Sequence, residues 1–237
     1  MIKKEVVGGI GCITLNRPEK FNALSVKMID QLLLVVKEFE RRKDVKGIII
    51  YGQGKHLCAG MDVNEIASAS KKKALEIAKK GLKACEAIES SKKVYLCCMK
   101  GYVLGGGLEI ALSCDLRICD KTVKCGLPEA KLGIVPGFGG ITRITNLCGK
   151  SVCQKIVLGN MMFDWKESLN AGIVHKVESN AEISGKKWMK LVVEQSGESL
   201  GLCKKLLKGS NYKKDVDAFA SCFGTKEQIN RMKRFRS

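Results

Sequence analysis

The sequence predicts an α/β fold in which short buried strands alternate with helices. Apolar runs of strand length recur along the first 180 or so residues, and segments with apolar residues at helical spacing separate them. The chain has only three prolines, and Pro18, Pro128 and Pro136 all fall in expected loops or at helix starts. Nothing in the pattern interrupts this alternation.

The N-terminal quarter predicts a hairpin, a helix and a buried strand. Residues 5–15 read as two short strands around the turn "GGIG", and "RPEKFNALS" reads as a loop. "SVKMIDQLLLVVKEFERRKD" carries apolar residues at helical spacing, with Ser25 as a candidate N-cap. "VKGIIIYGQG" then predicts a short buried strand that ends at glycines.

The middle of the chain continues the alternation. "HLCAGMDVNEI" predicts a loop leading into a helix, and "SKKVYLCCMKG" predicts another strand. "GGLEIALSCD" predicts a helix, "LRICDKTVKCGLPE" an extended segment, and "KLGIVPGFGG" a glycine-rich loop.

The last third is expected to be mainly helical. Strand patterns are hard to find after "AGIVHKVES", which places a boundary near residue 182. We therefore expect a core in residues 1–182 and a helical region in residues 183–237. The sequence contains no low-complexity linker and no clear internal repeat.

Composition indicates an ordinary globular protein. Apolar residues make up 45% and charged residues 28% of the chain, and no apolar run is long enough to span a bilayer. The N-terminus lacks the apolar core of a signal peptide, so we expect a cytoplasmic protein. The twelve cysteines contain no C-x-x-C and accompany only two histidines, which predicts buried free thiols and no metal site.

The net charge of +18 calls for an anionic partner or a solvated lysine-rich surface. Lysines occur in short clusters spread along the chain, and aromatic residues make up only 5% of it. This spacing favours steering of a polyphosphate-bearing substrate over nucleic-acid binding, which needs a basic stripe interleaved with aromatics.

Two acidic residues are candidates for catalysis. Glu109 lies in the apolar segment "GYVLGGGLEIALSCD" at a predicted helix start, where a carboxylate could either cap the helix or do chemistry. Glu129 follows Pro128 at another probable helix start, 20 residues later. The glycine-flanked turn in "HLCAGMD" could add backbone N–H donors. Carboxylates combined with such donors suit proton transfer around an enolate oxyanion.

The segments "HLCAGMD", "GYVLGGGLEIALSCDLRI" and "GLPEAKLGIVPGFGGITRI" closely resemble the enoyl-CoA hydratase/isomerase (crotonase) family, in order and spacing. "LNRPEKFNALS" and "DAFASCFGTKEQ" extend the resemblance over nearly the whole chain. It implies a crotonase-type spiral of repeated ββα units and a C-terminal helical region used for trimerisation, giving a homotrimer or homohexamer.

The resemblance also implies roles for individual residues. Glu109 and Glu129 match the two acid/base carboxylates, and Gly137 matches the glycine that positions the reacting water. The oxyanion hole is expected from the backbone N–H groups of Ala59 and Gly106. The remaining candidates should contact the acyl-CoA thioester: Lys20 and Phe21 near the adenine, and Ala59, Gly60, Met61 and Asp62 around the thioester.

The implied activity is reversible addition of water to a trans-2-enoyl-CoA. The family's isomerases are the nearest alternative, but they commonly keep one of the two acids. A decarboxylase or hydrolase fits the acid pair less well, and an RNA-binding relative is the alternative from another class. We expect no metal or separate cofactor, because coenzyme A is part of the substrate. The chain departs from many relatives at Cys125 and Leu127, beside Glu129.

Overall fold

The fold is built on a six-stranded sheet with strand order β1-β2-β3-β4-β6-β8. The computed structural model describes residues 1–236. β1 runs antiparallel to β2, and every other neighbouring pair in this sheet is parallel. The strands are β1 (Ile2–Val7), β2 (Ile10–Leu15), β3 (Gly47–Gly52), β4 (Val94–Met99), β6 (Leu116–Cys119) and β8 (Lys176–Val177). The predicted α/β class is confirmed.

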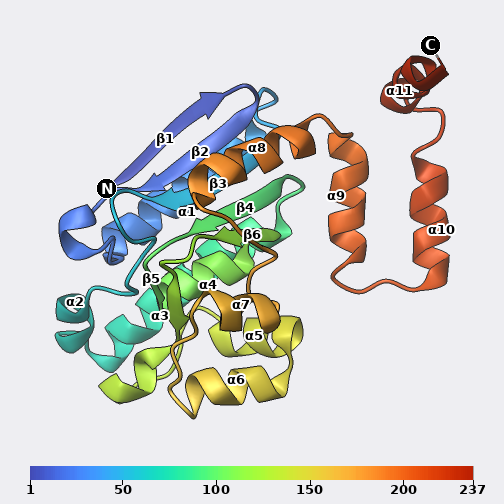
Figure 1. Cartoon of the computed structure of the whole chain (residues 1–237). Coiled ribbons are helices and arrows are strands. Elements are labelled where there is room, and N and C mark those ends of the chain that lie inside the picture. The colour runs from blue at the N-terminus through green and yellow to red at the C-terminus, as the bar shows by residue number, and fades with distance from the viewer. Residues whose placement is uncertain (237) are drawn as a thin grey trace.

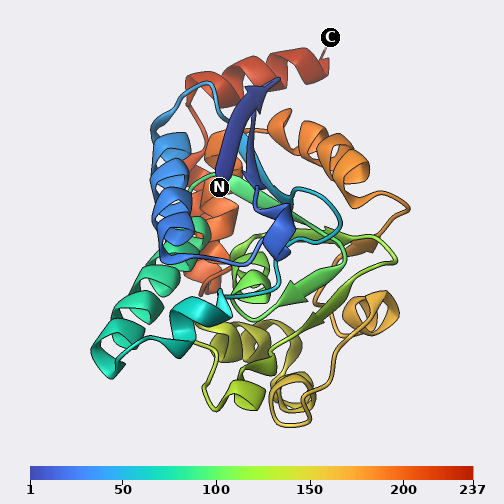
Figure 2. The same cartoon turned by 90° about the vertical axis from the view of Figure 1, so that its left-hand side faces the viewer.

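β2, β3 and β4 are buried along their whole length, because helices cover both faces of this sheet. α1 (Val26–Arg41) and α3 (Lys71–Ser90) pack together on one face. α8 (Ala181–Val193) contacts β2, β3, β4 and β6 from the other. Figure 2 shows α1 on the left and α8 on the right of the first strands. The predicted N-cap is confirmed, since the Ser25 hydroxyl accepts from Met28 N at 3.2 Å.

A second, smaller sheet belongs to a structural repeat that has no matching repeat in the sequence. β5 (Tyr102–Leu104) pairs in parallel with β7 (Lys124–Gly126). Bridges from Cys58 to Val103 and from Cys125 to Phe163 extend it on both sides. Successive chain segments thus send one strand to the large sheet and the next to the small one, which is the expected ββα spiral.

Short helices follow the strands of the small sheet. The loop after β3 leads into α2 (Val63–Ala67), and β5 leads into α4 (Gly106–Ser113). β7 leads into a 3₁₀ turn, η2 (Pro128–Leu132), and then α5 (Gly140–Cys148). The remaining elements are η1 (Pro18–Lys20), α6 (Lys150–Val157) and α7 (Trp165–Asn170). The α2–α3 and η2–α5 regions therefore flank the N-terminus of α4.

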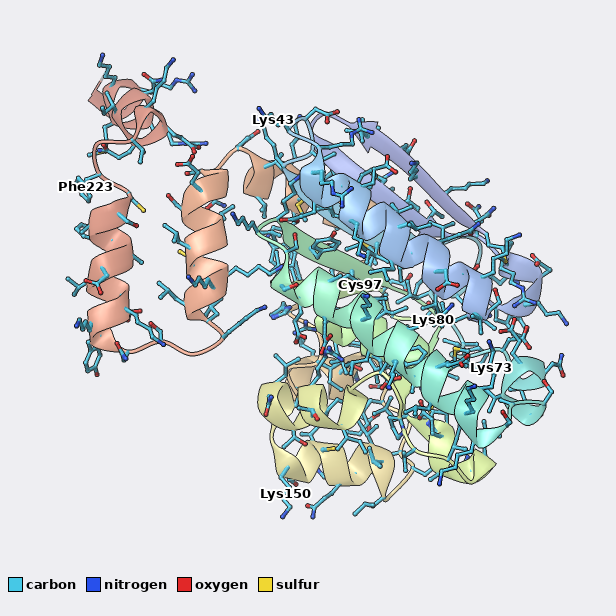
Figure 3. All side chains as sticks on the ribbon, turned by 180° about the vertical axis from the view of Figure 1, so that it is seen from behind. Lys43, Lys73, Lys80, Cys97, Lys150 and Phe223 are labelled. Atoms are coloured by element: carbon cyan, nitrogen blue, oxygen red, sulfur yellow. The ribbon has the colours of Figure 1, made fainter. Side chains whose placement is uncertain are left out.

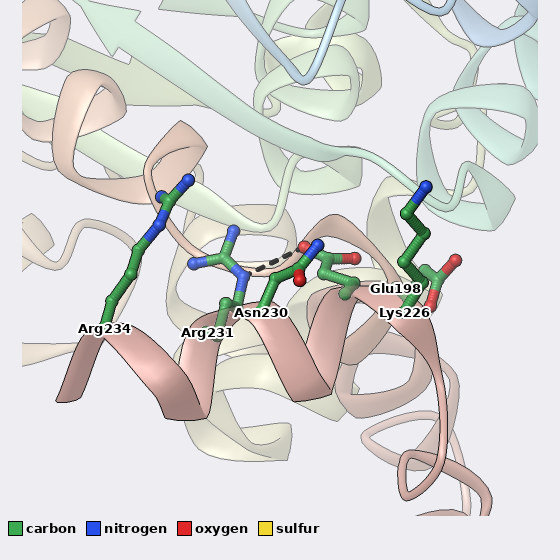
Figure 4. A pocket seen from close by; sticks show the side chains of 6 residues that line it. Glu198, Lys226, Asn230, Arg231 and Arg234 are labelled. Carbon is green, nitrogen blue, oxygen red and sulfur yellow. Dashed lines mark hydrogen bonds and ion pairs between the residues drawn. The ribbon is translucent and has the colours of Figure 1, made fainter. Parts of the chain in front are cut away.

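Three helices follow α8 at the C-terminal end, and the first of them, α9, contacts β4 (Figure 1). They are α9 (Gly197–Leu206), α10 (Tyr212–Ser221) and α11 (Lys226–Arg236). α11 is tied back where Arg231 donates to the Glu194 carbonyl at 2.9 Å. Figure 4 shows Arg231 and Arg234 around the hollow that α11 forms with Glu198 of α9.

A buried lysine fastens α9 to the core. Lys204 Nζ donates to the carbonyls of Ile88 and Lys93 at 3.1 and 3.0 Å, and to Asp115 Oδ2 at 2.8 Å. It also lies 5.4 Å from the centre of the Tyr95 ring. Since the Lys204 side chain is only 8% exposed, this ion pair is shielded from solvent.

The predicted boundary at residue 182 falls inside α8. Met189 and Val192 of this helix belong to a hydrophobic cluster with Ile49 and Leu96 of the sheet. A division there would cut a helix that covers the core. In space, the helices that leave the sheet begin with α9 (Figure 1).

The positive charge is distributed over many elements. Figure 3 shows Lys43, Lys73 and Lys150 on separate parts of the molecule, and all three are exposed. The twelve cysteines are free, and most of them are buried, as their apolar neighbours predict. Among the described residues, no helix combines the length and apolar character needed to cross a membrane.

Candidate active site

Glu109 is buried at the start of α4, and its carboxylate accepts hydrogen bonds from the start of another helix, α5. It is 1% exposed. Its Oε1 accepts hydrogen bonds from Phe138 N at 2.7 Å and Gly140 N at 2.8 Å, at the beginning of α5. Glu109 therefore does not cap α4. Burial raises the pKa of Glu109, while these two N–H groups oppose that rise.

Glu109 has one oxygen left for chemistry. Both recorded donors contact Oε1, and within residues 1–236 no hydrogen bond reaches Oε2. One oxygen is therefore fixed by the backbone while the other can accept a proton. A glycine is needed at position 140, because a Cβ there would lie 2.8 Å from the Glu109 Cγ.

Glu129 reaches the same place from η2. A Cβ built on Gly105, the N-cap of α4, would lie 2.7 Å from Glu129 Oε1. Its Oε2 is buried and has no hydrogen-bond partner among the described residues. Burial, and next the charge of Glu109, raise the pKa of Glu129 to about 7. Folding thus brings the two predicted acids close enough to influence each other's protonation.

The predicted oxyanion donor Ala59 is corrected by the hydrogen bonding of its loop. Ala59 N donates to the carbonyl of Phe21 at 3.0 Å, so this N–H is already committed. The next residues form a bridge with Leu24: Leu24 N donates to the Gly60 carbonyl at 2.7 Å, and Asp62 N donates to the Leu24 carbonyl at 2.9 Å. This pairing turns Met61 N away from Leu24, and in the described chain it has no recorded acceptor.

Met61 N and Gly106 N lie on two loops that touch. A Cβ on Gly60 would be 3.1 Å from the Leu104 carbonyl oxygen, and one on Gly105 would be 3.8 Å from Gly60 Cα. Gly60 and Gly105 have φ angles of 98° and 47°, which L side chains rarely adopt. Gly106 N likewise lacks a recorded acceptor within residues 1–236. Both donors therefore belong to residues next to the contact between Gly60 and Gly105, and Gly105 is also the neighbour of the Glu129 carboxyl.

Gly137 completes the surroundings of the acids. It is exposed, and a Cβ there would meet only Ala78 of α3, at 3.6 Å. In the part of the chain that the structure describes, Gly137 N donates no hydrogen bond. It immediately precedes Phe138, whose N–H holds Glu109. The position is therefore compatible with the predicted contact to a water molecule.

Phe21 and Lys20 lie at the outer end of the Ala59 loop. Phe21 is 52% exposed and packs edge-on against His56, with ring centres 5.0 Å apart. His56 in turn stacks on Tyr102 at 4.6 Å, and its Nδ1 accepts from Tyr102 N. Nothing in the sequence connects His56 with Phe21, which lies 35 positions earlier in the chain. Their proximity arises only when β5 pairs beside Cys58.

Asp62 is tied down by a residue that sequence reasoning missed. Arg17 pairs with Asp62 at 2.8 Å, which lowers the pKa of that carboxyl. The Asp62 side chain also caps α2 by accepting from Asn64 N.

Leu127, where many relatives differ, is 1% exposed, and its Cδ1 would lie 3.2 Å from a Cβ on Gly140. It therefore packs beside the Glu109 site.

Comparison with known proteins identifies this arrangement. A profile of the enoyl-CoA hydratase/isomerase family matches residues 5–221. The chain belongs to this family. The match includes both acids, the two touching glycine loops and the glycine-rich segment before α5, so the crotonase spiral expected from the sequence is confirmed together with the family.

Individual family members are similar over almost their full length. A short-chain-enoyl-CoA hydratase of Clostridium acetobutylicum is 30% identical, with 99% of this chain and 93% of the relative aligned. A probable mitochondrial enoyl-CoA hydratase of Dictyostelium discoideum is 32% identical over 98% of this chain and 86% of that protein. The crystal structure of an enoyl-CoA hydratase from Thermoplasma volcanium has a TM-score of 0.94 at 27% identity, covering 100% and 97% of the two chains.

Proposed function

We propose that the protein is an enoyl-CoA hydratase that reversibly adds water to a trans-2-enoyl-CoA and gives the 3-hydroxyacyl-CoA. The observation that carries this proposal is the pairing of the buried Glu109 with the half-buried Glu129, whose Oε2 is buried, near two backbone N–H groups that have no acceptor among the described residues. The relatives named as hydratases support it. Coenzyme A enters as part of the substrate, and the proton chemistry needs no further cofactor.

The oxyanion hole begins the reaction. Met61 N–H and Gly106 N–H donate to the thioester oxygen, which makes C3 of the enoyl group electrophilic. As negative charge develops on that oxygen, the same two donors stabilise the enolate. Removing one such donor in a well-studied enzyme costs about 3–4 kcal/mol of transition-state stabilisation. Because both donors belong to the backbone, truncating the Met61 side chain leaves its N–H available.

The two acids then divide the proton transfers. Glu109 Oε2 takes a proton from water while the water oxygen bonds to C3 and the electron pair moves to the thioester oxygen. Glu129, protonated, gives its proton to C2 as the thioester carbonyl re-forms. The pKa of about 7 for Glu129 suits this role, since a useful fraction is protonated near neutral pH. Proton exchange with solvent restores both groups.

Isomerisation of a double bond is the competing activity in this family. It requires proton removal and return but no water, so one acid suffices. The presence of both carboxylates, and of Gly137 N–H beside Phe138, favours hydration. We place the adenine end of the substrate near Lys20 and Phe21, and the thioester along Ala59, Gly60, Met61 and Asp62.

Hydration of crotonyl-CoA tests the proposal. Glu109→Gln and Glu129→Gln should each lower kcat by about 10²–10⁴-fold, the usual contribution of a positioned acid or base. The readout is the loss of the conjugated enoyl absorbance. Glu76→Gln, on the exposed surface of α3, is the matched control and should keep normal turnover. Near-normal activity in either acid variant would rule out the two-carboxylate mechanism.

A 3-enoyl-CoA substrate separates the two family activities. The hydratase proposal predicts that turnover of crotonyl-CoA exceeds conversion of the 3-enoyl thioester. Faster double-bond migration than hydration would identify an isomerase instead. This comparison uses the same purified protein, so differences in folding or assembly do not affect it.

A further inference from the structure

Arg143 of α5 lies behind the glycine-rich loop that holds Glu109. The residue is 7% exposed, although it carries a guanidinium group. Its Nη2 and Nε donate to the two carboxylate oxygens of Glu89 on α3, at 2.9 and 3.3 Å. Such a two-point contact fixes the plane of the guanidinium as well as its position.

The remaining arm of Arg143 contacts the loop itself. Nη1 donates to the carbonyl of Phe138. The N–H of the same residue, Phe138, donates to Glu109 Oε1 at 2.7 Å. Phe138 is therefore held from both sides of its backbone: Arg143 takes the carbonyl, and Glu109 takes the N–H.

The loop is shaped to admit this guanidinium. A Cβ on Gly139 would lie 2.6 Å from Arg143 Nη1, so any side chain there would displace it. Gly139 also has a φ angle of 95°. Arg143 N donates to the Gly139 carbonyl at 3.0 Å, which joins the guanidinium site to the first turn of α5.

We propose that Arg143, anchored by Glu89, is a positioning residue that holds the Phe138 backbone in line with Glu109 and keeps that carboxylate aimed for proton transfer. The inference rests on the proposed hydratase activity for its kinetic consequence. It requires no contact between Arg143 and the substrate.

The groups that face Glu109 determine the direction of the effect. Arg143 approaches from α5, the Cys85 thiol from α3 and the Glu129 carboxyl from η2. Burial raises the pKa of Glu109, whereas the N–H groups of Gly140 and Phe138, and after them the charge of Arg143, lower it. Loss of Arg143 removes a positive charge and loosens one of these donors. Both changes should raise the pKa of Glu109 further.

Arg143→Met and Arg143→Lys test the inference through the pH profile of kcat/KM for crotonyl-CoA. Glu109 must be ionised to act as a base, so activity rises with pH through its pKa on the acidic limb. Arg143→Met should move that limb to higher pH and lower kcat by up to about a hundredfold, with little change in KM. Arg143→Lys, which keeps the charge but not the fork, should place the limb between those of the wild type and Arg143→Met.

Arg117→Met is the matched control. Arg117 is also buried, at 2% exposed, but it donates to the carbonyls of Ile173 and Cys114. This variant should lose stability while the acidic limb stays in place. A folded Arg143→Met protein with a wild-type limb, or an equal shift in Arg117→Met, would overturn the inference.

Glu89→Gln provides a second measurement if Arg143→Met does not fold. The Glu89 side chain is 41% exposed, so the variant should fold. It loosens the guanidinium but also removes a negative charge from its surroundings, so kcat should fall with little change in KM while the limb does not move to higher pH. A wild-type kcat would then refute the role. NMR titration of glutamate carboxyl carbons, assigned with Glu109→Gln, reports the Glu109 pKa without substrate. It therefore tests the inference even if the protein fails to hydrate enoyl thioesters.

Discussion

At the scale of single residues, the two carboxylates differ in what satisfies their oxygens. Glu109 is more deeply buried, yet two backbone N–H groups stabilise its ionised form. Glu129 has a buried oxygen without a recorded partner in the described residues, and its pKa rises to about 7. Because hydrogen-bond donors favour the charged form, the environment favours Glu109 as the base and Glu129 as the acid.

Glu129 should make the protein less stable as pH rises. Its folded-state pKa of about 7 lies above the ordinary value of 4.5, so the folded protein holds this proton more tightly than the unfolded chain does. The stability gained below pH 4.5 is therefore lost as pH rises to about 7. Glu129→Gln, which cannot ionise, should gain about 1–3 kcal/mol over the wild type at pH 8.

Urea denaturation at pH 5 and pH 8 measures this effect. The difference between variant and wild type should be small at pH 5 and larger at pH 8. A constant difference across this range would contradict the raised pKa. Turnover would fall in the same variant, so the stability gained and the activity lost would come from one oxygen.

Backbone donors are tested by replacing the amide with an ester. An α-hydroxy acid at position 61 removes the Met61 N–H, and we expect kcat to fall by about 10²–10³-fold because one oxyanion donor is lost. The same replacement at position 59 removes the bond to the Phe21 carbonyl and should affect stability more than kcat. The control is matched, because the two replacements turn the carbonyls of Gly60 and Cys58 into ester carbonyls, and both of these carbonyls accept strand-type hydrogen bonds. A larger kcat loss at position 59 would restore Ala59 as the donor.

The sequence located the acids more accurately than the donors. Glu109 and Glu129 stand out because carboxylates are unusual in apolar, glycine-rich segments. The choice between the N–H groups of Ala59 and Met61 depends on which one bonds to the Phe21–Leu24 segment, and that follows from the strand-like register between distant parts of the chain. Arg143 gave no signal, since an arginine in a helical segment usually lies at the surface.

At the scale of elements, the ring of Phe138 sets the spacing between α3 and α4. A Cβ on Gly81 of α3 would lie 2.2 Å from this ring, and one on Gly106 of α4 would lie 3.0 Å from it. Phe138 is 3% exposed. The ring therefore fills the gap between the two helices, directly beside Gly106, a proposed oxyanion donor.

Gly81→Ala should destabilise the protein by about 1–3 kcal/mol, because the added methyl overpacks the Phe138 ring. This outcome opposes helix propensity, which favours alanine by about 1 kcal/mol. Gly197→Ala on α9 is the matched control, since nothing lies within 4 Å of a Cβ there, and it should be neutral or stabilising. Urea midpoints decide between them. A Gly81→Ala protein as stable as the control would mean that the ring can move away.

The large sheet was the easier part of the fold to predict. β2, β3 and β4 are continuous apolar runs, and a parallel strand buried on both faces needs such a run. The small sheet was not predictable, because β5 and β7 are three residues each and are paired by the spiral rather than by their composition. The long helix α3 was not separated from α2, because Lys71–Lys73 hide its amphipathic start.

At the scale of the whole molecule, α10 presents an unpaired apolar stripe. Tyr212, Val216 and Phe219 of α10, and Phe223 just after its end, are all more than half exposed and recur at helical spacing. The rings of Phe219 and Phe223 lie 4.9 Å apart, and Figure 3 shows Phe223 at the outer side of the terminal helices. We propose that a second copy of the chain covers this stripe in a homotrimer or homohexamer.

Phe219→Asp should shift the protein toward monomers, because a charge would have to be buried at the subunit contact. Sedimentation velocity gives the mass in solution. Leu34→Asp on α1 is the control, since Leu34 is 67% exposed, comparable to Phe219 at 68%, but lies outside the stripe. A wild-type monomer, or an unchanged mass for Phe219→Asp, would count against assembly through α10.

Lys204 has a consequence for how the terminal helices come loose. Detaching α9 would strip Asp115 of its cation and leave three oxygen acceptors in the core without their common donor. Partial detachment would break the Lys204–Asp115 ion pair while both charges remain largely buried, so partly detached states are unfavourable. Helices α9 to α11 are therefore expected to detach in one cooperative step. The Lys204 amine should react with acylating reagents only in the detached form.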